Sequence, residues 1–439
     1  MERSLRFVLL GTFTLRFSTG LTGAMLGLYL ADLPGYGGPV VDARLVGLLA
    51  ALFYLTELVL SPIFGILSDR YGHHRVMLYG PIFGAVAVII TGLTAYWLNA
   101  GFQVDSQLSI LGLTRLLEGA STAASVPSIL GFIALATAGN ELLRGKAAAR
   151  FEGATLAGLG FGFIVAPTLF ARFGANAFYL NAIVYGISFL IYWRGVKDPA
   201  GEAERVASEH VGFARYAALV RSSHVLLLAP TWIALNASIG LWFSQSLFQF
   251  SQPNPSFPDQ TLMRGFDSNQ ITLAAIVIAV VFGAGLLYWG NRFKSMRRTT
   301  IILYGIIGGA VLVLGGLIVN HSGGQSIAVL IAAVALAGGG LFVLAGATPA
   351  ALGLLADISE RFPADRGAIM GLYSVFLAIG QIAGSLIGGF AAEWRGIDGM
   401  LLATFALLAI ALVPLNRLRR QEHEIDAVNR PLTAPVANA

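Results

Sequence analysis

Long apolar runs recur along the whole of this 439-residue chain, and they constrain its fold more than any other feature. A helix needs about 20 apolar residues to cross the bilayer core. Only 12% of the residues are charged, far fewer than in a soluble domain. The expected fold class is therefore an all-α membrane protein. We predict twelve transmembrane helices, near residues 7–30, 45–66, 76–98, 108–137, 150–171, 177–193, 224–250, 269–289, 300–319, 326–355, 367–390 and 399–415.

The basic residues predict which side of the membrane each loop faces, because cytoplasmic loops carry an excess of Lys and Arg. With the N-terminus inside, most of the 28 basic residues fall in cytoplasmic loops. The predicted outer loops hold only Arg44, Arg172, Arg264 and Arg395. The net charge of +5 is thus explained by orientation, and we expect no nucleic acid partner. We expect an integral protein of a bacterial inner (plasma) membrane, with both termini cytoplasmic.

The chain divides into two similar halves. The longest polar segment, residues 194–223, separates the predicted spans six and six. One shift, of 222 residues, places Asp69-Arg70 on Asn291-Arg292, Arg75 on Arg297, and Arg144-Gly145 on Arg366-Gly367. In such repeats the substrate site lies between the halves, near the midplane. We predict an N-terminal bundle at 1–193, a cytoplasmic linker at 194–223, a C-terminal bundle at 224–416 and a cytoplasmic tail at 417–439.

A charged loop, GILSDRYGHHR, follows the second predicted span. It resembles the loop between helices two and three of the major facilitator superfamily, roughly Gly-x-Leu-x-Asp-Arg-x-Gly-Arg-Arg. The matching residues are Gly65, Leu67, Asp69, Arg70, Gly72 and Arg75. His73 and His74 replace the usual basic pair. The resemblance covers essentially the whole chain, and it implies two pseudo-symmetric six-helix halves and transport by alternating access.

The resemblance implies that this loop is a conformational latch. In the family, Asp69 would face the start of helix eleven, near Arg366, where the helix dipole favours an acid. Because that contact exists only when the cytoplasmic side is closed, it would bias the outward-facing state. The alternative is a solvated inner loop that obeys the positive-inside rule. The residues predicted for the latch are Gly65, Asp69, Arg70, Gly72, Arg75 and Arg366.

Four charged residues lie deep in predicted spans: Arg16, Glu57, Arg115 and Glu118. An unpaired charge at such depth costs at least ~2.5–3.5 kcal/mol, so these residues usually pair with each other or face a cavity. Arg115 and Glu118 are three residues apart and therefore share one helix face. The set is formally neutral, and a proton on either glutamate would leave it positive. The alternative is a structural ion-pair network that locks helices one, two and four together.

The stretch from Arg115 to Gly119, Arg-x-x-Glu-Gly, resembles the helix-four motif of proton-coupled members of the family. In that motif the arginine is tied to proton coupling. By that resemblance we expect Arg115 to tune a carboxylate, with Glu57 or Glu118 as the group that titrates.

Helix five gives two further indications. Glu152 lies near its cytoplasmic start beside Arg150, and an interfacial partner is the simpler interpretation. The glycines that follow, with Ala166-Pro167, resemble the antiporter motif, although Ala166 stands where the motif has glycine. Close helix packing explains the glycines equally well. The chain as a whole resembles the drug:proton antiporter branch of the family.

The second half offers aromatic and amide side chains, and we find no ionisable residue deep in its predicted spans. A pocket that is charged on one wall and aromatic on the other suits an amphipathic molecule. The predicted substrate-binding residues are Phe17, Asn236, Trp242, Phe243, Gln245, Tyr373 and Gln381. We find no phosphate-binding loop and no catalytic or metal motif. We therefore expect no cofactor, no metal and no enzyme activity, with the proton gradient as energy source.

These patterns predict a monomeric secondary transporter in the lipid bilayer. We expect it to move a small amphipathic or lipophilic solute by alternating access, and to export it in exchange for protons. The alternative within transport is proton-coupled or facilitated uptake of a polar or anionic solute, with Arg16 and Arg115 clamping the anion. Outside transport, the alternatives are a membrane scaffold or receptor on the same fold, and then a membrane enzyme.

Overall fold

The computed structural model describes residues 2–97, 101, 103–137, 141–197, 225–292, 295–359 and 366–429. These residues form α-helices and three short 3₁₀ helices, and no strand occurs among them. The predicted linker lies outside the described residues from 198 onward, and the predicted tail does so from 430.

Seven α-helices lie in the described residues before residue 198. They are α1 (Glu2–Ala31), α2 (Ala43–Tyr71), α3 (His73–Met77), α4 (Tyr79–Thr94), α5 (Val104–Ala136), α6 (Glu141–Phe173) and α7 (Ala177–Gly195). Six helices follow: α10 (Val225–Ser251), α11 (Ser268–Arg292), α12 (Arg298–Asn320), α13 (Ile327–Leu344), α14 (Ala347–Ser359) and α15 (Arg366–Asn429). The 3₁₀ helices are η1 (Leu33–Tyr36), η2 (Gly174–Asn176) and η3 (Thr261–Met263).

The helices match the predicted membrane spans. Nine stretches of the described chain are long and apolar enough to cross a membrane. Two of them, Arg150–Gly195 and Ser374–Arg420, are 46 and 47 residues long and hold two spans each. The first includes most of α6 and all of α7, and the second lies within α15, which breaks at Arg395 and Gly396. Counted with the 30-residue α1, the described residues hold twelve helical spans.

The tenth predicted span is not a single straight helix. The tenth span divides into α13 and α14, and the chain turns between them at Ala345 and Gly346. A Cβ atom at Gly346 would lie only 2.6 Å from the indole ring of Trp289 on α11. Because real Cβ atoms do not approach other atoms so closely, glycine is needed where the turn packs against this ring.

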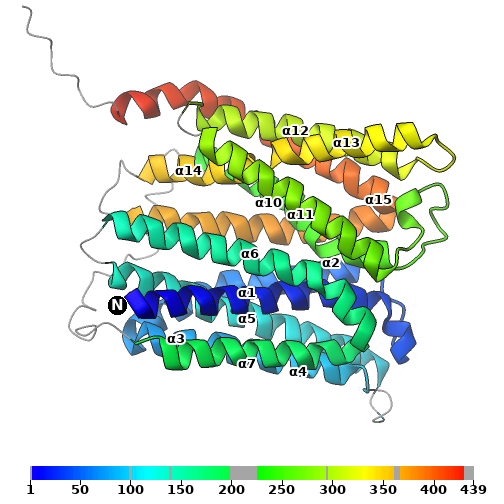
Figure 1. Ribbon diagram of the computed structural model, residues 1–439, viewed down its shortest axis with the longest axis horizontal. Coiled ribbons are helices and arrows are strands. Elements are labelled where there is room, and N and C mark those ends of the chain that lie inside the picture. The colour runs from blue at the N-terminus through cyan, green and yellow to red at the C-terminus, as the bar shows by residue number, and fades with distance from the viewer. Residues whose placement is uncertain are drawn as a thin grey trace, which may run out of the picture. The chain divides into compact units, whose positions relative to one another are not determined.

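The chain separates into two compact units, which are described one at a time. The first unit comprises Met1–Glu209, Gly240–Val277 and Gln381–Met400. Within it, α1 packs against α6 and α7, α2 packs against α5, and α4 packs against both α5 and α7 (Figure 1). Its core includes the fully buried side chains of Tyr29, Phe132, Phe178, Tyr185 and Tyr192.

The first turns of α2 also pack within this unit against α10 and α15. A Cβ at Gly47 would collide with the carbonyl oxygen of Ser385 on α15, and one at Gly389 would lie 2.7 Å from the carbonyl oxygen of Ala43. The same Ala43 oxygen accepts a hydrogen bond of 2.9 Å from Nε2 of Gln245 on α10. We call the packing of Gly47 on α2 and Gly389 on α15 against the facing backbone the glycine contact. It brings the backbones of the two helices together.

The second unit comprises His210–Ile239, Ile278–Gly380 and Leu401–Ala439. In it, α12 packs against α13 and α14. Its core gathers aliphatic side chains such as Ile301, Ile306 and Leu354. At the start of α12, Arg298 Nε lies 3.3 Å from Asp357 Oδ2 of α14, and both side chains are partly exposed.

Candidate functional site

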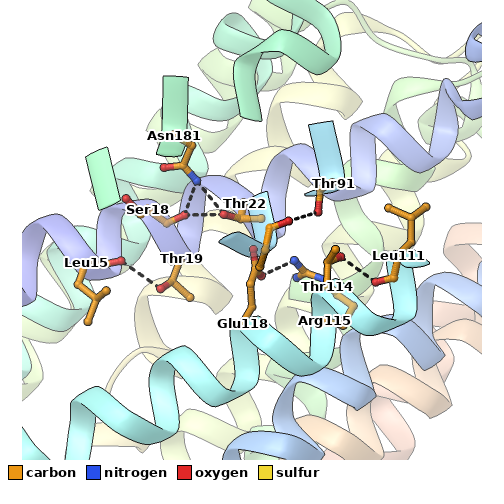
Figure 2. Close-up of polar contacts among 11 residues, drawn as sticks. Leu15, Ser18, Thr19, Thr22, Thr91, Leu111, Thr114, Arg115, Glu118 and Asn181 are labelled. Carbon is orange, nitrogen blue, oxygen red and sulfur yellow. Dashed lines mark hydrogen bonds and ion pairs between the residues drawn. The ribbon is translucent and has the colours of Figure 1, made fainter. Parts of the chain in front are cut away.

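The two charged residues of α5 form an ion pair between Arg115 Nη2 and Glu118 Oε2 (Figure 2). Their side chains are only 4% and 1% exposed. The three-residue spacing puts them on one helix face, as predicted from the sequence. The pair is therefore internal to α5 and sealed from solvent, and its charges balance each other.

Polar groups of α1 and α7 enclose this pair. The hydroxyl of Thr22 on α1 donates to the carbonyl oxygen of Ser18 at 2.9 Å (Figure 2). On α7, Asn181 Nδ2 donates to Thr22 Oγ1 at 2.7 Å and to the Ser18 carbonyl oxygen at 3.0 Å (Figure 2). Tyr185 of α7 is fully buried and interacts electrostatically with Glu118. The hydrogen bonds of Asn181 thus connect α1 to α7 beside the ion pair of α5.

A second charged group is formed by Arg16 of α1, Glu57 of α2 and Glu152 of α6. Arg16 interacts electrostatically with both glutamates. Tyr54, one turn before Glu57, interacts with Glu57 and with Arg16. Arg16, Glu57, Glu152 and Tyr54 are all half-buried, in contrast to the closed pair of α5. We call Arg16, Glu57 and Glu152 the Arg16 cluster.

Glycines bring the helices of these charged groups together. A Cβ at Gly158 of α6 would lie 2.8 Å from Cβ of Arg16. A Cβ at Gly119 of α5 would lie 3.2 Å from the backbone nitrogen of Glu57. Both positions require the smallest residue because α6 and α5 approach α1 and α2 at these levels. The glycine after Glu118, part of the sequence motif, therefore serves helix packing beside the charges.

The four deep charges predicted as one set thus have different immediate partners. Arg115 forms an ion pair with Glu118, whereas Arg16 interacts electrostatically with Glu57. Glu152, which the sequence placed beside Arg150 at the membrane interface, has an electrostatic interaction with Arg16, and its pairing with Arg150 stays a prediction. Sequence reasoning gave Tyr54 no role, although its position three residues before Glu57 puts both on one face of α2 and was the available signal.

The loop after α2 contains the residues predicted for the latch. Gly72 ends α2 with a φ of 96°, a conformation that favours glycine. Asp69, Arg70 and Arg75 are exposed. A Cβ at Gly65 would make only an ordinary contact, 3.8 Å from Pro127 Cβ. The side chain of Arg366 lies outside the described residues, so the latch stays a prediction.

The two histidines of this loop contact the first bundle. His73 is buried, with Nε2 3.9 Å from Asp69 Oδ1 and Nδ1 3.1 Å from Ser68 Oγ. A Cβ on Gly131 of α5 would collide with its ring. His74 Nε2 lies 3.1 Å from the carbonyl oxygen of Tyr192 on α7. The histidines that replace the family's basic pair therefore pack the loop against α5 and α7.

The predicted substrate-binding residues have varied surroundings. Phe17 and Trp242 are half-buried, whereas Phe243 is 54% exposed and packs edge to face on Phe163 of α6. Asn236, Gln245 and Gln381 are buried. The side chain of Tyr373 lies outside the described residues.

The buried amides take part in helix contacts. Asn236 Nδ2 donates to the carbonyl oxygen of Trp232 at 2.9 Å, one turn earlier in α10. Gln245 forms the hydrogen bond to α2 described above, and Gln381 lies against Gly240. Substrate binding by these residues stays a prediction.

Comparison with known proteins gives a consistent family match. The family model described as Major Facilitator Superfamily matches residues 8–253 and 246–437. Multidrug resistance protein 1 of Bacillus subtilis (strain 168) is 26% identical over 360 residues, which cover 78% of this chain and 79% of that protein. Quinolone resistance protein NorA of Staphylococcus aureus (strain MSSA476) is 24% identical over 399 residues, which cover 89% of this chain and 90% of NorA.

Solved structures show the same fold at low sequence identity. The nucleoside transporter NupG superposes with a TM-score of 0.63 and 14% identity, covering 94% of this chain and 99% of NupG. The human organic anion transporter MFSD10 (TETRAN) gives a TM-score of 0.59 and 18% identity, covering 95% of this chain and 99% of MFSD10.

Proposed function

The chain belongs to the Major Facilitator Superfamily, and from this premise we propose that it exports a small amphipathic or lipophilic solute in exchange for protons. The observation that carries the proposal is the presence of carboxylates beside arginines within membrane-spanning helices: Glu118 beside Arg115, and Glu57 near Arg16. A carboxylate in this setting can gain and lose a proton during a transport cycle.

Export is favoured over uptake by two observations. The relatives similar along most of the chain are named for multidrug and quinolone resistance, which export of a toxic compound from the cell would provide. Anion uptake would use Arg16 and Arg115 as a clamp, but Arg115 is already paired with Glu118 and buried. A scaffold or receptor would gain nothing from charges at this depth, which are costly in a membrane.

The proposal includes the organisation predicted from the sequence. The two bundles at 1–193 and 224–416 would alternate access around a site between them, joined by the linker at 194–223. Both termini, including the tail at 417–439, would lie in the cytoplasm of a bacterial cell, and the protein would act as a monomer. Energy would come from the proton gradient, with no metal or organic cofactor.

Transport in proteoliposomes tests the function directly. The purified chain is reconstituted, a pH gradient is imposed, and the flux of a fluorescent amphipathic dye is followed. The wild type should move the dye against the direction of proton flow, and Glu57→Gln or Glu118→Gln should abolish this coupling. Asp32→Asn, an exposed loop acid, is the matched control and should transport normally. Intact gradient-driven flux in both Gln variants would exclude the carboxylate mechanism, and absence of flux in the wild type would exclude transport of this dye class.

A further inference from the structure

The corner where α2 ends and α3 begins holds two histidines with opposite hydrogen bonds. Ser68 Oγ donates its single proton to the Gly65 carbonyl oxygen at 2.8 Å, so it can only accept from Nδ1 of His73, which lies 3.1 Å away. His74 Nε2 lies 3.1 Å from the Tyr192 carbonyl oxygen, which can only accept. Neutral His73 therefore carries its proton on Nδ1, whereas neutral His74 carries its proton on Nε2.

The unprotonated nitrogen of neutral His73 faces a carboxylate. Nε2 lies 3.9 Å from Oδ1 of Asp69, four residues earlier and across the end of α2 at Gly72. While the ring is neutral, both of these atoms are hydrogen-bond acceptors and the contact gains nothing. A proton on Nε2 makes that atom a donor and gives the ring a charge opposite to that of Asp69. The same two atoms then form an ion pair.

The two partners differ in their freedom to move. The side chain of His73 is 6% exposed, whereas that of Asp69 is 60% exposed. Gly131 of α5 lies against the imidazole, where any Cβ atom would collide with the ring. The packed ring therefore has a fixed position, and the solvated carboxylate is the partner that can close the gap when the ring becomes charged.

The other titratable groups around this corner are cations or neutral side chains. The helix α3 packs against α2, α4, α5 and α7. In α5, no titratable side chain occurs from residue 119 to residue 136. Arg70 of α2 is exposed and lies over the Tyr71 ring at 5.5 Å, so water screens its charge. The remaining groups on these elements near the corner are His74, Arg75, Tyr79, Tyr192 and Arg194. Asp69 thus supplies the negative charge beside His73.

We propose that His73 is an acid sensor on the predicted cytoplasmic side, where a proton on Nε2 forms an ion pair with Asp69 and fastens the end of α2 to the start of α3. Histidine is the side chain whose charge ordinarily changes between pH 5 and 8. The sensor itself does not depend on the proposed function. The proposed exchange would bring protons to this side of the membrane, so the corner would respond to the activity of the protein; that consequence rests on the proposed function.

Solid-state NMR of the full chain in lipid bilayers tests the sensor, with isotope-labelled histidine to report the ring nitrogens of all six histidines. The signals that His73→Gln removes identify His73. At pH 8 its Nδ1 should be protonated and its Nε2 unprotonated, and His74 should show the reverse. As the pH falls to 5, Nε2 of His73 should gain a proton. Asp69→Asn should lower the proton affinity of His73 about fivefold, as expected for opposite unit charges about 4 Å apart and open to water.

Two controls accompany this measurement. Asp32→Asn removes an exposed acid elsewhere in the chain and should leave the titration of His73 unchanged. Unchanged His74 signals in Asp69→Asn show that this variant keeps its fold. The inference is overturned if His73 carries its proton on Nε2 at pH 8, if it stays neutral down to pH 5, or if Asp69→Asn leaves its proton affinity unchanged.

Dye flux in everted membrane vesicles, whose outer medium bathes the predicted cytoplasmic face, tests the consequence for transport. Alternating access requires the inner ends of the helices to rearrange, so an added ion pair at the end of α2 should slow the cycle. At a constant pH difference, wild-type flux should fall more steeply than that of His73→Gln as the outer pH falls from 7.5 to 5.5. His73→Arg, which is charged throughout, should be slow at both pH values.

The sensor and the proposed function fail in different ways. If His73 titrates as expected but the wild type moves no solute in response to a pH gradient, the sensor stands and the exchange function fails. If gradient-driven flux is present but His73 does not titrate, or Asp69→Asn leaves its titration unchanged, transport stands and the sensor fails. Parallel pH profiles of the wild type and His73→Gln would exclude control of transport by this corner.

Discussion

Replacing Arg115 by methionine would leave Glu118 as an unpaired acid in the interior of the first bundle. Removing one partner of a buried ion pair typically costs about 3–5 kcal/mol. The side chains are 4% and 1% exposed, so solvent screening gives no reason to reduce this figure. We therefore expect a loss of about 3–5 kcal/mol.

Removing both charges should cost much less. In Arg115→Met with Glu118→Leu, no unpaired charge remains, and exchange of a buried pair for apolar side chains is often neutral or stabilising by about 1–4 kcal/mol. The single variant should also recover part of its loss as the pH falls from 8 to 5, because a protonated carboxyl group carries no charge. The double variant has no such carboxyl and should lack this recovery.

The measurement is reversible unfolding in mixed micelles, followed by the fluorescence of the chain's six tryptophans. The wild type and the single and double variants are compared at both pH values. Equal losses in the single and double variants, or a loss below about 0.5 kcal/mol for Arg115→Met, would refute the reasoning that the pair compensates a buried charge.

Three further changes test the packing of the bundles by the same unfolding measurement. Gly47→Leu should lower the free energy of unfolding by about 1–3 kcal/mol, because Ser385 fills the space beside Gly47. Gly23→Leu is the control and should lower it far less, because no atom lies within 4 Å of its Cβ position. Equal losses in the two variants would count against the glycine contact. Asn181→Leu removes two hydrogen bonds to α1 and should cost about 1–3 kcal/mol, and an unchanged stability would contradict this. Arg298→Ala breaks the partly exposed pair with Asp357 and should lower the free energy of unfolding by less than about 1 kcal/mol. A larger loss would show that this pair stabilises the protein more than expected for a partly exposed ion pair.

The sequence was sufficient to predict the spans because a membrane imposes a length of apolar helix that can be counted directly. It did not predict the turn at Ala345 and Gly346, because the apolar character continues through it. The turn is visible only where Gly346 meets the Trp289 ring, and that contact joins residues far apart in the chain.

The same limit applies to the candidate site: contacts within one helix could be predicted from the sequence, and contacts between distant helices could not. Pairing of Arg115 with Glu118 follows from helix geometry within four residues, so it could be predicted. The relation of Glu152 to Arg16 depends on α6 packing against α1, which no local pattern contains. Likewise, His73 and His74 look like surface residues of a charged loop until α5 and α7 are placed beside them.

The glycine contact between α2 and α15 has a consequence for how this protein can change by mutation. Gly47 and Gly389 have no side chain that could be trimmed, and the atoms they meet belong to the peptide backbone. Every substitution at these two positions adds volume, so each one wedges the helices apart and none draws them closer. Substitutions at the glycine contact therefore act in one direction only, toward separation of α2 from α15.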